Sequence, residues 1–365
     1  MKKYLCILLF LLISLIFSPK VVFANCEDLE KYKGKVINLE EVSCEGVEDG
    51  KCISYSVEIL EGDLRGEKID IQPMATAFGH SKYSIGDKVY ISGICGLGDE
   101  IIWGIENYSR ESSIFFLLLA FVLIVFLVSG VKGLGSILGL VMSFFVIYSI
   151  MIPLSIQTGN VLLCGIFSVP LVLVISIYLS HGFNKKSTIA LACTLIGLLI
   201  IGILSAIFIA STKLTGFGNE EVYMLLSQIG GNISVKGILF VSILVSGIGI
   251  LDDVTVSQVG TVIELAKANP KMGTYELYKS SMNIGKDHIS SMVNTLFIAY
   301  AGSSLSMIML MNANGASWYE IINGEFFAEE IVRAVVSSMG LVLVVPITAY
   351  IASLFTPELI ERRKI

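Results

Sequence analysis

The sequence predicts a polytopic α-helical membrane protein with about seven transmembrane helices and a small exported β-rich domain at the N-terminus. Of 365 residues, 54% are hydrophobic and only 15% are charged, and the mean hydropathy is +0.79. Soluble domains carry about 25% charged residues, so this composition indicates a membrane protein. Long apolar runs recur after residue 111, whereas polar, alternating segments fill the stretch before it. The net charge of −6 gives no indication of nucleic-acid binding.

The N-terminus has the pattern of a secretory signal peptide. Lys2 and Lys3 precede an apolar run, 4–17, and Val22-Phe23-Ala24 supplies small residues before a cleavage site. We therefore predict a signal peptide over residues 1–24, with an uncleaved signal anchor as the alternative. Four cysteines follow in the exported segment, and they allow two disulfides in three pairings. They are Cys26, Cys44, Cys52 and Cys95.

Residues 25–110 are predicted to form an extracytoplasmic β-rich domain. Segments 35–39, 54–60, 67–71 and 88–92 alternate apolar and polar residues, and glycine turns separate them. Several short strands of this kind favour a small barrel, such as an OB-type barrel. Because no aromatic residues follow a basic groove, we expect this domain to be structural or to contact an extracytoplasmic protein partner.

The transmembrane domain is predicted over residues 111–365. Seven apolar runs in it are each about long enough to cross the bilayer. They lie near 112–131, 134–152, 159–180, 187–211, 233–251, 289–311 and 331–354. The outer segment 219–230 has an apolar face typical of an interfacial helix. Gly130, Gly133, Gly135 and Gly139 predict close helix packing.

The lysine and arginine residues orient the predicted spans. With residues 25–110 outside, most basic residues of the loops fall inside, as the positive-inside rule requires. They are Lys132, Lys185, Lys186, Lys267, Lys271, Lys279, Lys286 and the tail Arg362-Arg363-Lys364. We therefore expect a protein of the cytoplasmic membrane with its C-terminus inside. At the outer start of the last span, the i,i+4 spacing of Glu329 and Arg333 predicts an ion pair.

The first candidate site begins at two adjacent carboxylates, Asp252 and Asp253, which end the apolar run 235–251. Carboxylates at bilayer depth cost about 2.5–3.5 kcal/mol to insert, so they usually face protein, water or a ligand. The helical pattern continues to Asn269-Pro270, and Asp253, Ser257, Gly260, Glu264 and Lys267 share one face of it. Gln258 lies on the apolar remainder.

A second polar strip opens the sixth span on the same side of the membrane. It contains Asp287, His288, Ser291, Asn294 and Thr295. If the two strips meet, paired carboxylates and an imidazole could exchange protons near neutral pH. Carboxylate and amide oxygens could instead bind a hard cation. A hydrogen-bonded cluster at the helix ends is the structural alternative. No particular metal, cofactor or oligomeric state follows from these residues.

The residues in these two strips also carry a resemblance. Gly249-Ile-Leu-Asp252-Asp253-Val254, then Gln258 and Glu264, resemble the YibE/F-like family of prokaryotic multi-pass membrane proteins. The segment Asn283-Ile-Gly-Lys-Asp287-His288, continuing through Asn294-Thr295-Leu296 to Gly302, carries the same resemblance. The resemblance implies a bacterial cytoplasmic-membrane protein, but it implies no particular biochemical activity.

Three functions are compatible with these sequence features. A transporter or permease would use Asp252, Asp253, Gln258, Glu264, Asp287, His288, Asn294 and Thr295 to bind a proton, a cation or a substrate. A non-catalytic scaffold would use the same residues as internal contacts and the exported domain to hold a partner. An intramembrane aspartyl protease would need a second aspartate in a Tyr-Asp motif on a neighbouring span, and the sequence has none. We therefore expect a transporter rather than an enzyme.

Overall fold

The computed structural model describes residues 31–43, 51–71, 83–95, 101–230 and 233–361. The predicted signal peptide and the basic tail lie outside these ranges, as do Cys26 and Cys44. Cys52 is disulfide-bonded, and the side chain of Cys95 lies outside the described part. The chain divides into two compact units with the boundary between Ile124 and Val125, and each is described by itself.

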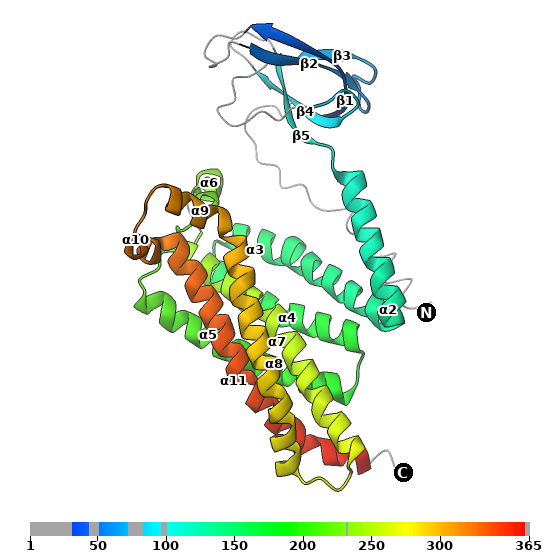
Figure 1. The fold of residues 1–365 in the computed structure, drawn as a ribbon, viewed down its shortest axis with the longest axis vertical. Coiled ribbons are helices and arrows are strands. Elements are labelled where there is room, and N and C mark those ends of the chain that lie inside the picture. The colour runs from blue at the N-terminus through cyan, green and yellow to red at the C-terminus, as the bar shows by residue number, and fades with distance from the viewer. Residues whose placement is uncertain (1–30, 44–50, 72–82, 96–100, 231–232, 362–365) are drawn as a thin grey trace. The chain divides into compact units, whose positions relative to one another are not determined.

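The N-terminal unit contains a five-stranded antiparallel sheet (Figure 1). The strands are β1 (Tyr32–Ser43), β2 (Lys51–Ile59), β3 (Lys68–Ile71), β4 (Lys88–Cys95) and β5 (Ile101–Tyr108). Their order in the sheet is β3-β2-β1-β4-β5, and β3 and β5 also contact each other. The alternating positions point inward, and six side chains are buried between the strands: Val36, Val57, Ile59, Ile71, Val89 and Ile91. The first four strands confirm the sequence prediction. β5 was missed because Ile101-Ile102-Trp103 does not alternate.

Glu111, the first residue of helix α2, is tied to the sheet. Its carboxylate accepts hydrogen bonds from Tyr90 Oη, Ser109 Oγ and Lys33 Nζ, the last at 3.1 Å. The carboxylate raises the pKa of Lys33, because it stabilises the ammonium ion, and that of Tyr90, because it accepts the phenol proton. These contacts attach the sheet to the first turn of α2.

The C-terminal unit is helical, and every apolar run predicted from the sequence is helical. The elements after the sheet are α2 (Glu111–Val146), the π-helix η1 (Ile147–Met151), α3 (Ile152–Thr158), α4 (Val161–His181), α5 (Lys185–Ser211), α6 (Glu220–Ile229), α7 (Val235–Ala268), α8 (Thr274–Ser303), α9 (Leu305–Ala313), α10 (Trp318–Asn323) and α11 (Glu325–Glu361). α6 matches the predicted outer helix, and α7 ends directly before Asn269-Pro270 as expected.

Polar side chains start three of the long helices. Asn160 Oδ1 accepts from Leu163 N before α4, and Asn184 Oδ1 accepts from Ser187 N before α5. Ser234 Oγ accepts from Gly237 N at 3.2 Å before α7. Each cap satisfies one amide that has no intrahelical partner, which stabilises a helix by about 1 kcal/mol. Short polar signals in the sequence therefore set where the apolar helices begin.

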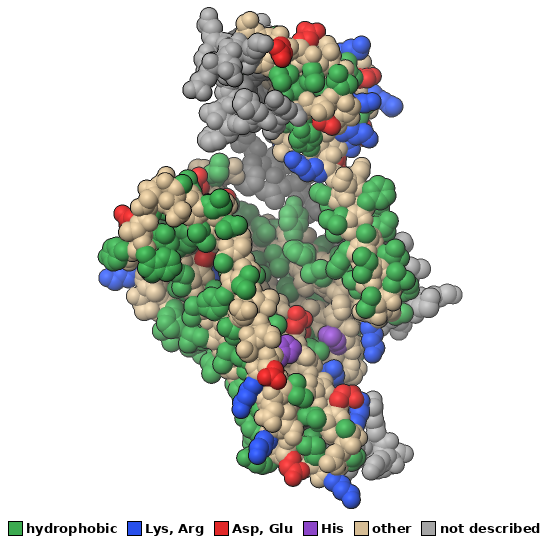
Figure 2. Space-filling model, viewed as in Figure 1, with side chains coloured by type: hydrophobic (Ala, Val, Ile, Leu, Met, Phe, Trp, Pro, Cys, Tyr) green, Lys and Arg blue, Asp and Glu red, His purple; other side chains and the backbone are tan. Residues whose placement is uncertain are grey.

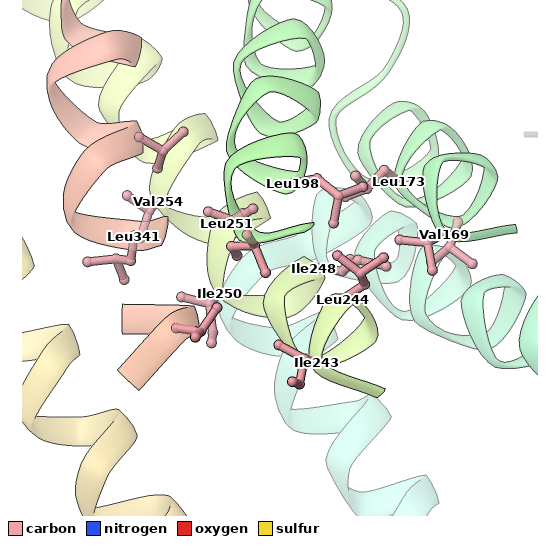
Figure 3. Packing of buried hydrophobic residues seen from close by; sticks show 14 of the residues in the cluster. Val169, Leu173, Leu198, Ile243, Leu244, Ile248, Ile250, Leu251, Val254 and Leu341 are labelled. Carbon is pink, nitrogen blue, oxygen red and sulfur yellow. The ribbon is translucent and has the colours of Figure 1, made fainter. Parts of the chain in front are cut away.

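Helix α7 is the centre of the helical unit. It packs against α4, α5, α8 and α11, and side chains of these helices form the largest buried cluster. Figure 3 shows Leu244, Ile248 and Leu251 of α7 among side chains of α4, α5 and α11. Leu251 is fully buried. This packing fixes the rotation of α7 about its axis, and thus the directions in which Asp252 and Asp253 point.

Five helices of the described chain are long and apolar enough to cross a membrane, or six if the pair α8 and α9 counts as one span. That pair is bent by 58°. The segment Glu111–Thr158 counts as a single candidate of 48 residues, but its backbone leaves the helical region at Gly130, with φ 59° and ψ −144°. The predicted number of about seven is therefore not reproduced by this count.

Glycines let α2 approach α4 closely. A Cβ added at Gly135 would lie 2.8 Å from the carbonyl oxygen of Leu179. At Gly139 it would lie 2.8 Å from Ser180 Oγ. The prediction of close packing from this glycine spacing is confirmed at these two positions, whereas Gly130 provides a break in the helix. The contact lies beside the end of α4 that carries Ser176 and His181.

Candidate functional site

The double aspartate lies on α7, about 26 Å along the helix axis from its start at Val235, given a rise of 1.5 Å per residue. The side chain of Asp252 is partly buried and that of Asp253 is exposed. Successive residues of a helix point about 100° apart, so the two carboxylates face different neighbours.

Asp252 points toward α4. Its Oδ2 accepts a hydrogen bond from Ser176 Oγ at 3.0 Å. Its Oδ1 is buried and has no hydrogen-bond partner among the described residues. A buried carboxylate oxygen without a donor is unfavourable by about 1–3 kcal/mol or more, so this oxygen is a position where a proton or a cation would be stabilising.

Asp253 lies within electrostatic range of two histidines, His181 and His288. His181 is the last residue of α4, and His288 comes from α8. Figure 2 shows the two described histidines, in purple, on one face of the helical unit with acidic side chains in red beside them. The cluster therefore combines two carboxylates with two imidazole side chains.

Two lysines lie near the histidine on α4. Lys132 of α2 and Lys186 of α5 are both close enough to His181 to interact with it electrostatically. Lys186 also interacts with Glu264. Lysines of α2 and α5 therefore lie near His181, whereas the groups that interact directly with Asp253 are the histidines of α4 and α8.

Gln258, a predicted site residue, forms a helix–helix contact instead of facing the aspartates. Its side chain is only 4% exposed, and its Nε2 donates to the carbonyl oxygen of Ser281 at 3.1 Å. Its amide also lies against Gly285, where an added Cβ would be 3.2 Å from Oε1. Gln258 therefore joins α7 to α8.

Glu264 lies apart from the double aspartate. It is eleven residues beyond Asp253, about 16 Å along the helix axis at 1.5 Å per residue. Its carboxylate is exposed and forms an ion pair with Lys267 at 2.6 Å. The inner end of the strip predicted on α7 is therefore a separate charged surface.

The strip predicted on α8 meets the double aspartate only at His288. Asp287, Asn294 and Thr295 are exposed, and no hydrogen bond joins them to α7 in the described part of the chain. Thr295 Oγ1 donates to the carbonyl oxygen of Ser291 in its own helix at 2.9 Å. Met292 and Leu296 of α8 are partly buried in the core, and α8 packs against α11. Asp287 and Asn294 lie on the opposite side of α8 and point away from this core.

Sequence reasoning missed the contribution of α4, namely Ser176 and His181. Ser176 is a single hydroxyl in an apolar run, and His181 directly precedes the helix-ending Gly182. A histidine at a helix C-terminus is favourably placed for a positive charge, and this was the available signal. Across the described residues, no group of three or more His, Cys, Asp or Glu side chains is arranged to hold a metal ion.

The outer end of α11 carries a second charged region. Glu330 Oε1, rather than the predicted Glu329, pairs with Arg333 Nη1 at 2.6 Å. Glu329 instead turns toward the loop before α6 and accepts from Gly218 N at 3.0 Å. The i,i+4 prediction was wrong because the backbone amide of Gly218 in that loop binds Glu329, which is 3% exposed. Glu325 accepts from Thr215 and Gly216 in the same loop.

These long apolar helices define a multi-pass helical membrane protein. A family model described as "YibE/F-like protein" matches residues 117–358. The match covers well over half of the sequence, and the chain belongs to the YibE/F-like family. It confirms the resemblance found in the double-aspartate segment and in α8. No curated protein and no solved structure matches the chain with significant similarity.

Proposed function

We propose that this protein is a transporter of the cytoplasmic membrane that binds a proton or a small cation at Asp252 and Asp253. The observation that carries the proposal is the partly buried carboxylate of Asp252, which has one oxygen bound by Ser176 and the other without a partner in the part of the chain that the structure describes. Ionisable groups inside membrane bundles usually line ion or proton pathways. His181 and His288 beside Asp253 supply groups that can pass protons to and from the carboxylates.

Seven spans are part of this proposal. The 48 residues of Glu111–Thr158 would extend for about 72 Å as one helix, more than twice the hydrocarbon thickness of about 30 Å. The break at Gly130 supports two spans there, and the bent pair α8–α9 supports a broken span. With α4, α5, α7 and α11, the total is seven.

The orientation follows from an odd number of spans and from the lysines. Residues 25–110 lie outside, the C-terminus lies inside, and the double aspartate lies at the cytoplasmic edge. We infer that the exported sheet is an OB-type barrel, because β1 pairs with both β2 and β4 and the end strands β3 and β5 contact each other. Its role in this proposal is structural or in binding an extracytoplasmic protein, after removal of residues 1–24.

A non-catalytic scaffold is the second candidate. The hydrogen bond between Ser176 and Asp252 favours it, because this bond joins α4 to α7 whether or not anything is transported. The two functions differ in one respect. A scaffold requires Asp252 only for folding, whereas a transporter requires its charge for flux.

The test is ion flux in proteoliposomes. Wild-type protein would be compared with Asp252→Asn and Asp253→Asn under a pH gradient, with Na⁺, K⁺, Mg²⁺ and a panel of small solutes as probes. We expect both variants to remain folded and their flux to fall to that of protein-free liposomes, because an amide cannot take up and release a proton or hold a cation by charge. Glu276→Gln is the matched control, since this exposed residue caps α8 and a glutamine preserves the cap.

Two results would contradict the transporter. Unchanged flux in both folded variants would remove the double aspartate from any pathway. Absence of flux in wild-type protein for every probe, together with unfolding of the variants, would support the scaffold.

A further inference from the structure

A polar face follows α7 from the double aspartate toward the outer side of the membrane. Its members are spaced three or four residues apart and therefore share one side of the helix. They are Ser242, Ser246, Gly249, Asp253 and Ser257, called here the α7 polar face. None of them is buried, whereas Ile243, Leu244, Ile248, Ile250 and Leu251 on the other sides are buried. The helix thus turns its polar side away from the core.

Charged residues of α11 lie at the outer end of this face. Arg333 Nη2 donates to Ser242 Oγ at 3.4 Å, and Nη1 pairs with Glu330 at 2.6 Å. The two charged side chains are only 20% and 16% exposed, and Arg333 Nε is buried without a partner in the described part of the chain. Partly buried ions in a span are unfavourable unless water or protein surrounds them, so this pair requires a polar environment rather than lipid around it.

A hydroxyl pair lies between the two ends. Ser246 Oγ and Tyr300 Oη are hydrogen-bonded, which brings α8 against the α7 polar face just before α8 ends at Ser303. From Ser242 to Asp253 the face extends over about 16 Å at 1.5 Å per residue. Hydroxyl groups therefore occupy the stretch between the outer ion pair and the acidic cluster.

We infer that the α7 polar face is the outer half of a water-lined route to the double aspartate, with the Arg333–Glu330 pair at its outer mouth. The inference rests on the proposed function and names the path that the ion takes. A guanidinium and a carboxylate balance each other in charge, and hydroxyls can both donate and accept, so the route suits protons carried along water and hydroxyl groups. Exposure of the same face to lipid would place serines and a carboxylate in hydrocarbon.

The test is the water accessibility of single cysteines. Ser242→Cys and Ser246→Cys would each be exposed, in the whole protein in liposomes, to a membrane-impermeant thiol reagent from outside. The thiolate is the form of cysteine that attacks such reagents, and it forms in water and not in lipid. We expect both cysteines to react above the wild-type level. The native Cys164 and Cys193 are buried and contribute little background.

Matched controls are Leu199→Cys and Ile203→Cys on α5. Both positions are exposed on the chain, at 63% and 53%, and lie at the depth of Ser246, because Ile201 packs against Gly247. They face lipid in the proposed orientation, so we expect no reaction. A second variant, Arg333→Gln, would break the outer ion pair and should speed the labelling of Ser246→Cys.

The outcomes separate the route from the transporter. Absence of labelling at both serine positions, with Ser257→Cys reactive from inside, would overturn the route while leaving the flux result with Asp252→Asn unaffected. Equal labelling of the α5 controls would also overturn it, because water access would not be specific to the α7 polar face. If one serine variant fails to fold, the other carries the test.

Discussion

At the scale of single residues, the unusual feature is a carboxylate that satisfies only half of its hydrogen-bonding capacity. Asp252 could accept several donors, but among the described residues only Ser176 donates to it, and one buried oxygen has no partner there. Buried polar atoms usually have hydrogen-bond partners, as Oε1 of Glu325 does, where Thr215 and Gly216 donate to it. This contrast favours Asp252 as the residue that binds an ion.

Ser176→Ala should lower the unfolding free energy by about 1–3 kcal/mol, because it leaves a buried carboxylate with no donor. The test is a double-mutant cycle with Asp252→Leu, in which the unfolding free energy of each variant is measured by denaturant unfolding in detergent micelles. In the Asp252→Leu background the serine change should cost little, since no charge then needs the hydroxyl. Equal costs in both backgrounds would show that the hydrogen bond does not stabilise the fold.

At the scale of helices, close packing depends on one isoleucine between two glycines. Ile201 of α5 is fully buried against Gly247 of α7 and Gly340 of α11. A Cβ added at Gly340 would lie 2.3 Å from Ile201 Cγ1, and one at Gly247 would lie 2.8 Å from Cδ1. Helices α5, α7 and α11 can therefore approach one another this closely only because both glycine positions lack a side chain.

Gly340→Ala should destabilise the protein by about 1–3 kcal/mol through overpacking. Combining it with Ile201→Ala should cost less than the sum of the two changes, because the shorter side chain makes room for the new methyl group. Thermal unfolding measures both effects. Gly302→Ala is the control, since a Cβ added at this helical glycine would meet no atom of a described neighbouring residue within 4 Å. Alanine there should be neutral or stabilising by up to about 1 kcal/mol. Additive costs would contradict the packing argument.

At the scale of the whole molecule, the number of spans decides on which side the acidic cluster lies. The described helices meet the length and hydropathy criteria five or six times, and the break at Gly130 accounts for the difference from seven. Only an odd number of spans would place the N-terminal sheet and the C-terminus on opposite sides of the membrane. The topology therefore depends on whether the chain turns at Gly130.

Lys132→Cys, just after the break at Gly130, should react with an impermeant thiol reagent from the cytoplasmic side only. Lys271→Cys, between α7 and α8, should react from the same side, and Asn314→Cys, between α9 and α10, from the outer side. Inside-out and right-side-out vesicles distinguish these cases. Failure of Lys132→Cys to react from either side would mean that Glu111–Thr158 does not form two spans.

Much of the helical frame could be predicted from the sequence. The seven apolar runs are helical, α7 stops at Asn269-Pro270, and the family is confirmed by residues 117–358. The site was less predictable. Asp253 and His288 lie within electrostatic range of each other, but Gln258 bonds Ser281, Glu264 bonds Lys267, and Asp287 and Asn294 face away from the core. Helical periodicity shows which residues share a face, but it does not show which face a neighbouring helix covers.

The sequence by itself determined the class of the protein, because hydropathy and charge act on each segment separately and determine whether it crosses a bilayer. It also located the double aspartate at the end of a span. Only the tertiary structure decided the partners of these carboxylates. Ser176 lies 76 positions before Asp252 in the chain, and the packing of α4, α5 and α11 around α7 brings the two together. Such contacts depend on the rotation of each helix within the bundle, which is set by side chains from all its neighbours at once.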